Sequence, residues 1–238
     1  MMALGATALI LLGLWLAFFL EQLSSALGIV LSMAVIMGEI SLPLMALERF
    51  QRDPKSLNMY AYRLETFFDF VLRPKNALAR PAWPQIGQEL IFTVILCAAV
   101  FVPYIAAYYG VQHYLAMTQH KTLIFSLNWP PMLIKETLLQ LFVVAFPEEF
   151  FYRGFLQGAL LEAWPNRRFV FGLPVGRAII VTNLLFALGH LVSGFHPMRA
   201  LTFFPGLIFS WIVYKRKNLL PAIIFLFMEI RDSFCLLI

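Results

Sequence analysis

The chain has few charged residues and few cysteines, and each shortage excludes a class of protein. Charged residues make up 13% of 238 positions, whereas soluble domains carry about 25%, so a soluble globular domain is excluded. The two cysteines, Cys97 and Cys235, lie far apart in apolar surroundings, which argues against a disulfide framework or a cysteine metal site. No glycine-rich phosphate loop and no internal repeat are present.

Apolar residues are abundant instead. Hydrophobic residues account for 61% of the chain, and the mean hydropathy is +0.79. The apolar runs are continuous and do not alternate, which disfavours a β-barrel. We therefore predict an all-α, polytopic transmembrane helix bundle with about seven segments of the length a bilayer requires. The predicted segments are 3–20, 24–46, 89–110, 132–162, 178–192, 200–214 and 218–230.

The net charge of +5 comes from basic residues that lie between the apolar runs. Threading the chain through seven spans places the three basic loops on one side, and the positive-inside rule makes that side cytoplasmic, with the N-terminus. We expect an integral protein of the bacterial inner membrane that binds no nucleic acid. The basic residues are Arg49, Arg52, Lys55, Arg63, Arg73, Lys75 and Arg80, then Arg167, Arg168 and Arg177, then Lys215, Arg216 and Lys217.

Three ionisable residues, Glu148, Glu149 and Arg153, lie inside one of the most apolar stretches. A charged side chain at the bilayer centre costs about 2.5–3.5 kcal/mol on insertion scales, so such a cluster indicates a functional site. On a helix, Glu149 can pair with Arg153, and Glu148 can meet Tyr152, because four residues separate each pair. Glu148 points about 100° away from Glu149. It is therefore placed to bind a water as a general base.

A second cluster lies on the 178–192 segment. Asn183, Phe186 and His190 share one face of that helix, because their spacings of three, four and seven follow its period. At 1.5 Å per residue, Glu148 lies about 22 Å and His190 about 18 Å from the cytoplasmic boundary. The similar depth predicts that they meet through water. The alternative is that the ion pair and the histidine only hold helices together.

At these residues the chain resembles a known family. Residues 147–154, Pro-Glu-Glu-Phe-Phe-Tyr-Arg-Gly, resemble the EExxxR motif of the CAAX-processing and bacteriocin-processing (CPBP, or Abi) intramembrane proteases. Residues 186–190 resemble the FxxxH motif of the same family, and the resemblance spans roughly 130–225. It implies a bundle of membrane helices that hydrolyses a peptide bond near the C-terminus of a membrane-associated protein or peptide.

The resemblance also implies roles for individual residues. Glu148 corresponds to the glutamate that activates the water, and His190 to the histidine that helps to hold it. Arg153 corresponds to the arginine that supports the glutamates, with Glu149 as its partner, while Phe186 and Tyr152 are supporting residues. The family has been described both as metal-dependent and as metal-independent. A divalent metal such as zinc at Glu148 and His190 therefore stays open, although no HExxH pair or second nearby histidine accompanies them.

The third family motif is missing. It consists of a histidine and, four residues later, an asparagine, which are thought to stabilise the oxyanion; here Leu226 and Ile230 occupy the two positions. We expect a truncated or frameshifted end, with a natural pseudoenzyme as the alternative. Asn183 is a candidate stand-in, although an interhelical hydrogen bond is the simpler role for it. His113, His120 and His196 are unsuitable, because we place them in loops.

The predicted organisation has three parts. Residues 1–46 form an N-terminal transmembrane hairpin, 47–88 a cytoplasmic loop with an amphipathic helix near 57–72, and 89–238 a protease-like membrane core whose last helix is truncated. We prefer an interfacial role for the amphipathic helix over a partner-binding one. The expected function is intramembrane proteolysis. The alternatives are a catalytically impaired membrane binding or chaperone-like protein and, third, a transporter, against which the lack of an inverted repeat counts.

Overall fold

The computed structural model describes residues 2–50, 83–118, 132–165, 168–216 and 218–226. The predicted interfacial helix near 57–72, together with His120, Ile230 and Cys235, lies outside these ranges. Within them the all-α class is confirmed, and a helix occupies each of the seven predicted positions. The one sheet of the described part is a pair of two-residue antiparallel strands.

The helices and strands follow one another in this order. They are α1 (Met2–Leu23), α2 (Ser25–Phe50), α5 (Trp83–Thr118), α6 (Leu133–Leu139), the π-helical η1 (Gln140–Ala145), α7 (Phe146–Glu149), the π-helical η2 (Phe150–Leu156), α8 (Gln157–Ala163), β1 (Phe169–Val170), β2 (Leu173–Pro174), α9 (Arg177–Val192), the 3₁₀ helix η3 (Pro197–Thr202) and α10 (Phe203–Arg216). A last helix covers 220–226.

Three helical stretches of the described chain are long and apolar enough to cross a membrane on their own. They are Met2–Leu23, Ser25–Ala46 and Gly87–Thr118, and Arg177–Val192 is a shorter apolar helix. The run from α6 to α8 is continuous but changes its hydrogen-bonding pattern along its length. These apolar helices make the protein an integral membrane protein.

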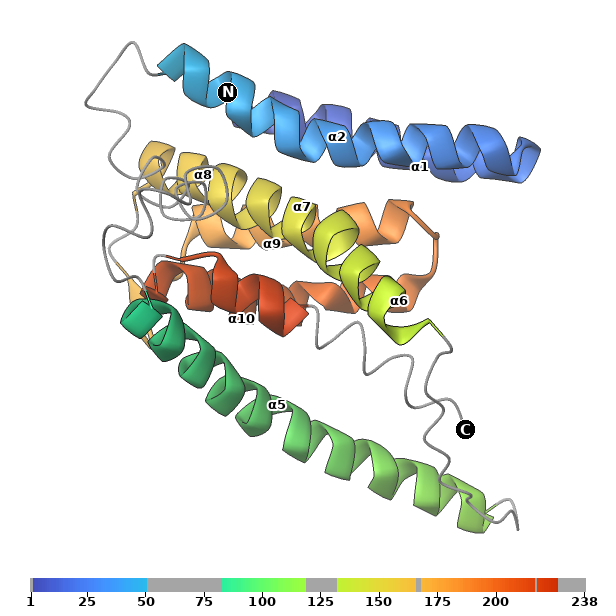
Figure 1. Ribbon diagram of the computed structural model, residues 1–238, viewed down its shortest axis with the longest axis vertical. Coiled ribbons are helices and arrows are strands. Elements are labelled where there is room, and N and C mark those ends of the chain that lie inside the picture. The colour runs from blue at the N-terminus through green and yellow to red at the C-terminus, as the bar shows by residue number, and fades with distance from the viewer. Residues whose placement is uncertain (1, 51–82, 119–131, 166–167, 217, 227–238) are drawn as a thin grey trace.

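The N-terminal hairpin is tightly packed because glycine residues lie where its two helices, α1 and α2, meet. A Cβ atom on Gly13 would lie 2.7 Å from Val35, and one on Gly28 would lie 2.7 Å from Glu21. Such close approach is how membrane helices gain packing energy without a hydrophobic driving force. The hairpin lies over α7, α8 and α9 (Figure 1), and α2 contacts both α7 and η2. The hairpin is therefore part of the bundle.

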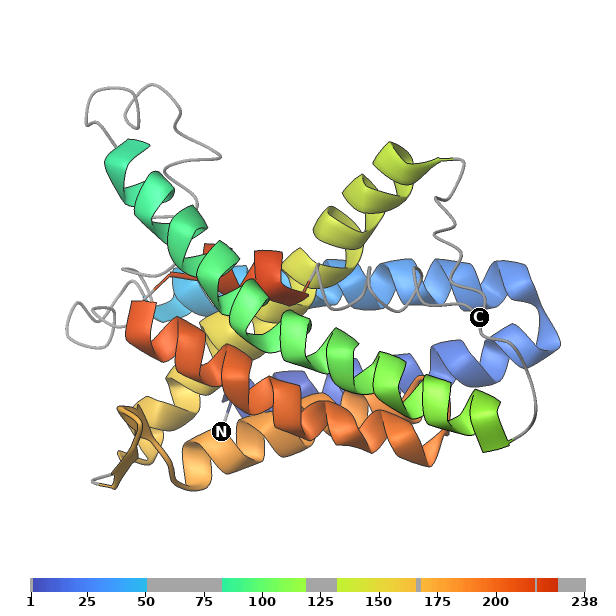
Figure 2. The same ribbon diagram turned by 90° about the horizontal axis from the view of Figure 1, so that it is seen from below.

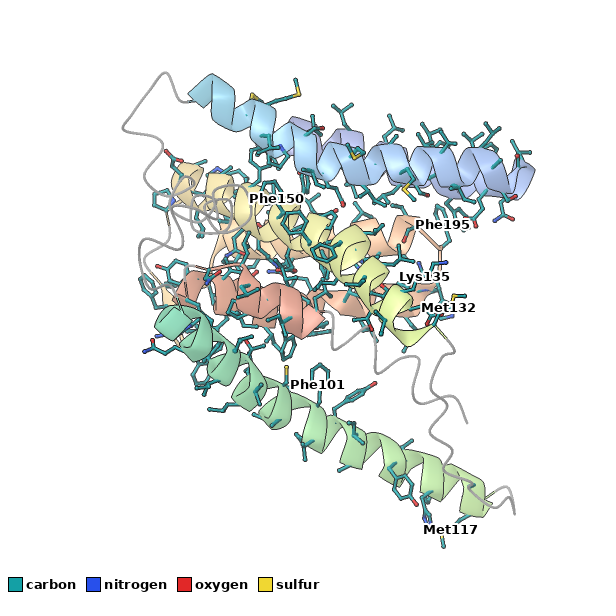
Figure 3. The ribbon with its side chains drawn as sticks, in the orientation of Figure 1. Phe101, Met117, Met132, Lys135, Phe150 and Phe195 are labelled. Atoms are coloured by element: carbon teal, nitrogen blue, oxygen red, sulfur yellow. The ribbon has the colours of Figure 1, made fainter. Side chains whose placement is uncertain are left out.

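Helix α5 runs along the opposite side of the bundle from the hairpin and leaves it toward its C-terminal end (Figures 1 and 2). Phe101 points from α5 toward the other helices (Figure 3), where its ring stacks on Phe225 at 5.1 Å between centroids. The helix continues to Thr118, beyond the predicted end at 110, because residues 111–118 contain neither proline nor glycine. The prediction that His113 lies in a loop is therefore wrong, whereas His196 lies in one.

The N-terminal part of α5 is joined to the end of α10 by an ion pair. Arg216 Nη2 and Nε donate to the two carboxylate oxygens of Glu89 at 2.7 and 2.8 Å. The same guanidinium lies 4.8 Å from the ring centroid of Phe92. The pKa of Arg216 is raised, chiefly by the hydrogen bond to Glu89. This contact fixes the one end of α5 that stays close to the bundle.

We expect this contact to contribute measurably to stability. The ion pair is bidentate and its cation also contacts an aromatic ring, so we predict a coupling energy of about 1 kcal/mol between Glu89 and Arg216. The measurement is a double-mutant cycle of Glu89→Gln and Arg216→Gln, followed by thermal unfolding in detergent. Lys215→Gln, at an exposed neighbouring cation, is the matched control. Additive effects of the two changes would contradict the expectation.

Candidate active site

Two π-helical segments flank the turn that carries both glutamates. Helix α7 comprises four residues, 146–149, with η1 directly before it and η2 directly after it. Pro147 has no backbone N–H to donate, so it cannot continue the α-helical hydrogen-bond ladder. Single π turns inside α-helices occur mainly at functional sites. Local sequence thus explains why the regular helix predicted over 132–162 is distorted where Glu148 and Glu149 lie.

The predicted pair of Glu149 and Arg153 is present and completely buried. Arg153 Nε lies 3.8 Å from Glu149 Oε1, and both side chains have no exposed surface. The Arg153 guanidinium carbon lies 4.4 Å from the ring centroid of Phe186 on α9 and 5.6 Å from that of Phe209 on α10. Cation–π attraction is strongest when, as here, the cation is desolvated. Arg153 therefore connects three helical segments.

A buried polar cluster lies beside this pair. Asn183 Nδ2 donates to Ser210 Oγ at 2.9 Å and to Ile179 O at 2.8 Å. Gln157 Nε2 donates to Ser210 O at 3.3 Å. Asn183 therefore makes the interhelical hydrogen bond considered above as its simpler role. Gln157 and Ser210 were not predicted from the sequence. Each could have been recognised as a polar residue within an apolar stretch.

Glu148 interacts electrostatically with both His190 and Arg153; that Glu148 and His190 meet through water stays a prediction. Glu148 Oε2 is buried and has no hydrogen-bond partner among the described residues. His190 Nδ1 lies 3.2 Å from Phe186 O and donates to it when the proton is on Nδ1. Nε2 then keeps its lone pair for the site. A carboxylate and an imidazole on neighbouring helical segments suit the activation of a water.

Two further groups reach the same place. The Tyr152 hydroxyl is buried, has no hydrogen-bond partner in the described part of the chain, and lies 2.8 Å from where a Cβ atom on Gly189 would stand. The charges of Glu148 and of Glu39, on α2, both act on this hydroxyl. Glu39 was not predicted from the sequence, although, like Glu148, it is an ionisable residue within an apolar run.

The donors present do not fit a catalytic zinc site. Such sites use three protein ligands and keep one position open. Within the described ranges, no three histidine, cysteine, aspartate or glutamate side chains are grouped closely enough to hold a metal ion. Glu148 and His190 alone fall short of that number.

The position of the missing third motif is apolar in space as well as in sequence. Leu226 is 4% exposed and belongs to the hydrophobic core, beside Phe225. The second position of the motif, residue 230, lies outside the described residues. The side chain of Leu226 therefore offers no hydrogen-bond donor at the first position of the motif.

Residues 130–228 match the model of a protein family described as type II CAAX prenyl endopeptidase Rce1-like. The predicted resemblance is thereby confirmed over this segment, which contains both motifs. The match supports a CAAX-type intramembrane protease. No curated protein and no solved structure matches the chain significantly.

Gly206 allows α10 to approach the polar cluster. A Cβ atom there would lie 2.5 Å from Asn183 Oδ1 and 3.3 Å from Arg153 Nη2. We expect Gly206→Ala to destabilise the protein by about 1–3 kcal/mol, as overpacking does. Thermal unfolding measures this. Gly110→Ala, on a helix where a Cβ atom meets nothing within 4 Å, is the control, and equal stability of the two variants would contradict the expectation.

The buried ion pair predicts a non-additive result. Arg153→Met removes the cation beside Glu149 and should cost about 3–5 kcal/mol, because it leaves a buried charge uncompensated. Adding Glu149→Leu should recover most of that loss, since apolar replacements of a whole buried pair are often tolerated. Denaturation in detergent measures both variants. A double variant no more stable than Arg153→Met would contradict the expectation that the uncompensated charge of Glu149 causes the loss.

Proposed function

We propose that the protein is an intramembrane endopeptidase in which Glu148 and His190 position and activate a water. The substrate is a membrane-associated protein or peptide that is cut near its C-terminus. The observation that carries the proposal is the approach of Glu148 on α7 to His190 on α9 within a buried site. The family match over 130–228 supports the reaction type.

The chemistry follows from the positions of these groups. Nε2 of His190 accepts a hydrogen bond from the water while the Glu148 carboxylate accepts another. Glu148 then takes the proton as the water oxygen attacks the scissile carbonyl carbon. The protonated Glu148 returns that proton to the leaving amine. General acid–base catalysis of this kind contributes about 10²–10⁴-fold.

Arg153 has a supporting role in this proposal. It is fully buried beside Glu149 and between two aromatic rings, so its position is fixed and its charge is poorly screened. Burial disfavours the ionised Glu148 carboxylate, and the positive charge of Arg153 partly offsets that cost. Glu149 balances the arginine, and Phe186 forms one wall of its enclosure. Arg153 and Glu149 thus position Glu148 rather than react.

A second function is favoured by one observation. Leu226 fills the place of the third-motif histidine with an apolar side chain that is packed into the core. A protein that keeps the cavity but lacks a donor for the oxyanion would bind its membrane partner without cleaving it. This non-catalytic binding or chaperone-like function is the alternative.

The proposal extends to orientation and location. We infer that the N-terminus is cytoplasmic and that the membrane is the bacterial inner membrane. The basic residues near described helix ends, Arg168, Arg177, Lys215 and Arg216, support a common cytoplasmic side, which positively charged loops prefer. In this orientation the bilayer and a membrane-associated substrate are the partners.

Glu148→Gln is the decisive variant. It keeps the shape of the side chain but cannot accept the proton, so cleavage of a prenylated peptide by the full chain in lipid vesicles should fall below detection. Peptide binding and thermal unfolding should change little. The matched control, Glu136→Gln on the exposed side of α6, should cleave at the normal rate. Unchanged cleavage by Glu148→Gln would rule out the catalytic assignment, and peptide binding without cleavage by the unmodified chain would establish the alternative.

A further inference from the structure

Glu39 is a carboxyl group that the mechanism above does not use. It lies within the apolar helix α2, outside the segment that matches the family model, and is 5% exposed. Helix α2 packs against α7, which carries Glu148, and against η2, which carries Tyr152 and Arg153. The N-terminal hairpin thus brings a third glutamate to the site.

Glu39 and Glu148 are close enough for their charges to interact. Both carboxyl groups also act on the Tyr152 hydroxyl. That hydroxyl lies against Gly189, next to His190 on α9. Glu39 on α2, Glu148 on α7 and Tyr152 on η2 therefore interact electrostatically with one another. Since Glu39 is buried and its helix packs against the segments that carry the other two, it lies on the side of α2 that faces the site.

Two neighbouring carboxyl groups in an apolar site cannot both remain ionised, because each destabilises the charge on the other. The positive charge of Arg153 acts on Glu148, whereas the charge that acts on Glu39 is the negative one of Glu148. The single negative charge therefore belongs on Glu148. Glu39 keeps its proton and is an O–H donor.

We propose that Glu39 is the second catalytic carboxyl group of this site, and that its proton takes over the oxyanion-stabilising role of the missing third motif. The inference rests on the proposed function. The apolar Leu226 side chain offers the developing oxygen charge no donor, and a protonated carboxyl group near the general base can provide one.

The reaction balances with these two groups alone. Glu148 takes a proton from the water, the water oxygen bonds to the carbonyl carbon, and the carbonyl oxygen takes the proton of Glu39, which gives a neutral tetrahedral diol. Glu148 then protonates the amide nitrogen and the carbon–nitrogen bond breaks. One diol hydroxyl returns its proton to Glu39. The products are an amine and a carboxylic acid, and both glutamates regain their starting states.

Kinetics of the full chain in lipid vesicles test this role. Glu39→Leu removes the donor and should lower kcat by about 10²–10³-fold with KM nearly unchanged, as the loss of one oxyanion donor does. Glu39→Gln keeps an N–H donor but cannot transfer a proton, so its kcat should lie between those of Glu39→Leu and the unmodified chain. Glu21→Gln, at the exposed end of α1 in the same hairpin, should behave as the unmodified chain.

A merely structural Glu39 predicts a different result. If it only holds the hairpin against the core, Glu39→Leu and Glu39→Gln should change thermal stability without a selective loss of kcat. A kcat within twofold of normal in Glu39→Leu overturns the proposal, and so does a kcat no lower in Glu39→Leu than in Glu39→Gln. If Glu39→Leu does not fold, a normal kcat in Glu39→Gln overturns it.

An infrared measurement separates this inference from the proposed function. The difference spectrum between the unmodified chain and Glu39→Gln should contain the carbonyl-stretch band of a protonated carboxylic acid. If that band is present but the unmodified chain cleaves no peptide, the proposed function and the catalytic role of Glu39 fail, while the proton on Glu39 stands. If the chain cleaves peptide but the band is absent, the role of Glu39 fails and the proposed function stands.

Discussion

The enclosure of Arg153 is the constraint on which the rest of the structure depends. A guanidinium with no exposed surface must be compensated within the protein, and the compensation comes from Glu149 one turn earlier and from aromatic rings on α9 and α10. These contacts hold three helical segments at fixed distances from one another. Glu149 lies next to Glu148 on α7, and Phe186 lies one turn before His190 on α9, so the contacts of this buried charge also fix the positions of the proposed catalytic residues.

The site is divided between two parts of the chain. The segment that matches the family model supplies Glu148, Tyr152 and His190, and the hairpin supplies Glu39. Helix α2 contacts both α7 and η2, so the hairpin packs directly against the segments that carry Glu148, Tyr152 and Arg153. The matched segment, 130–228, does not include α2 or its buried residue Glu39.

Sequence patterns predicted the buried pair of Glu149 and Arg153, because four-residue spacing on a helix is nearly independent of tertiary structure. They did not predict Glu39, because one glutamate in an apolar run has no spacing to indicate which helix it faces. Gln157, Ser210 and Gly206 were missed for a related reason. Their importance depends on how closely α10 approaches α9, and that distance follows from packing. The end of α5 was predicted at residue 110, because the residues that follow are more polar, whereas the helix continues to Thr118.

Within the run from α6 to α8, residues 150–158 have no side that faces lipid. Every one of them is buried, although they include tyrosine, arginine and glutamine. Most membrane helices expose at least one face to the surrounding acyl chains, whereas this stretch is surrounded by other parts of the protein. The effective dielectric around the reacting groups is therefore a property of the polypeptide, and changes in the thickness or headgroups of the surrounding bilayer would reach it only by moving the helices that enclose it.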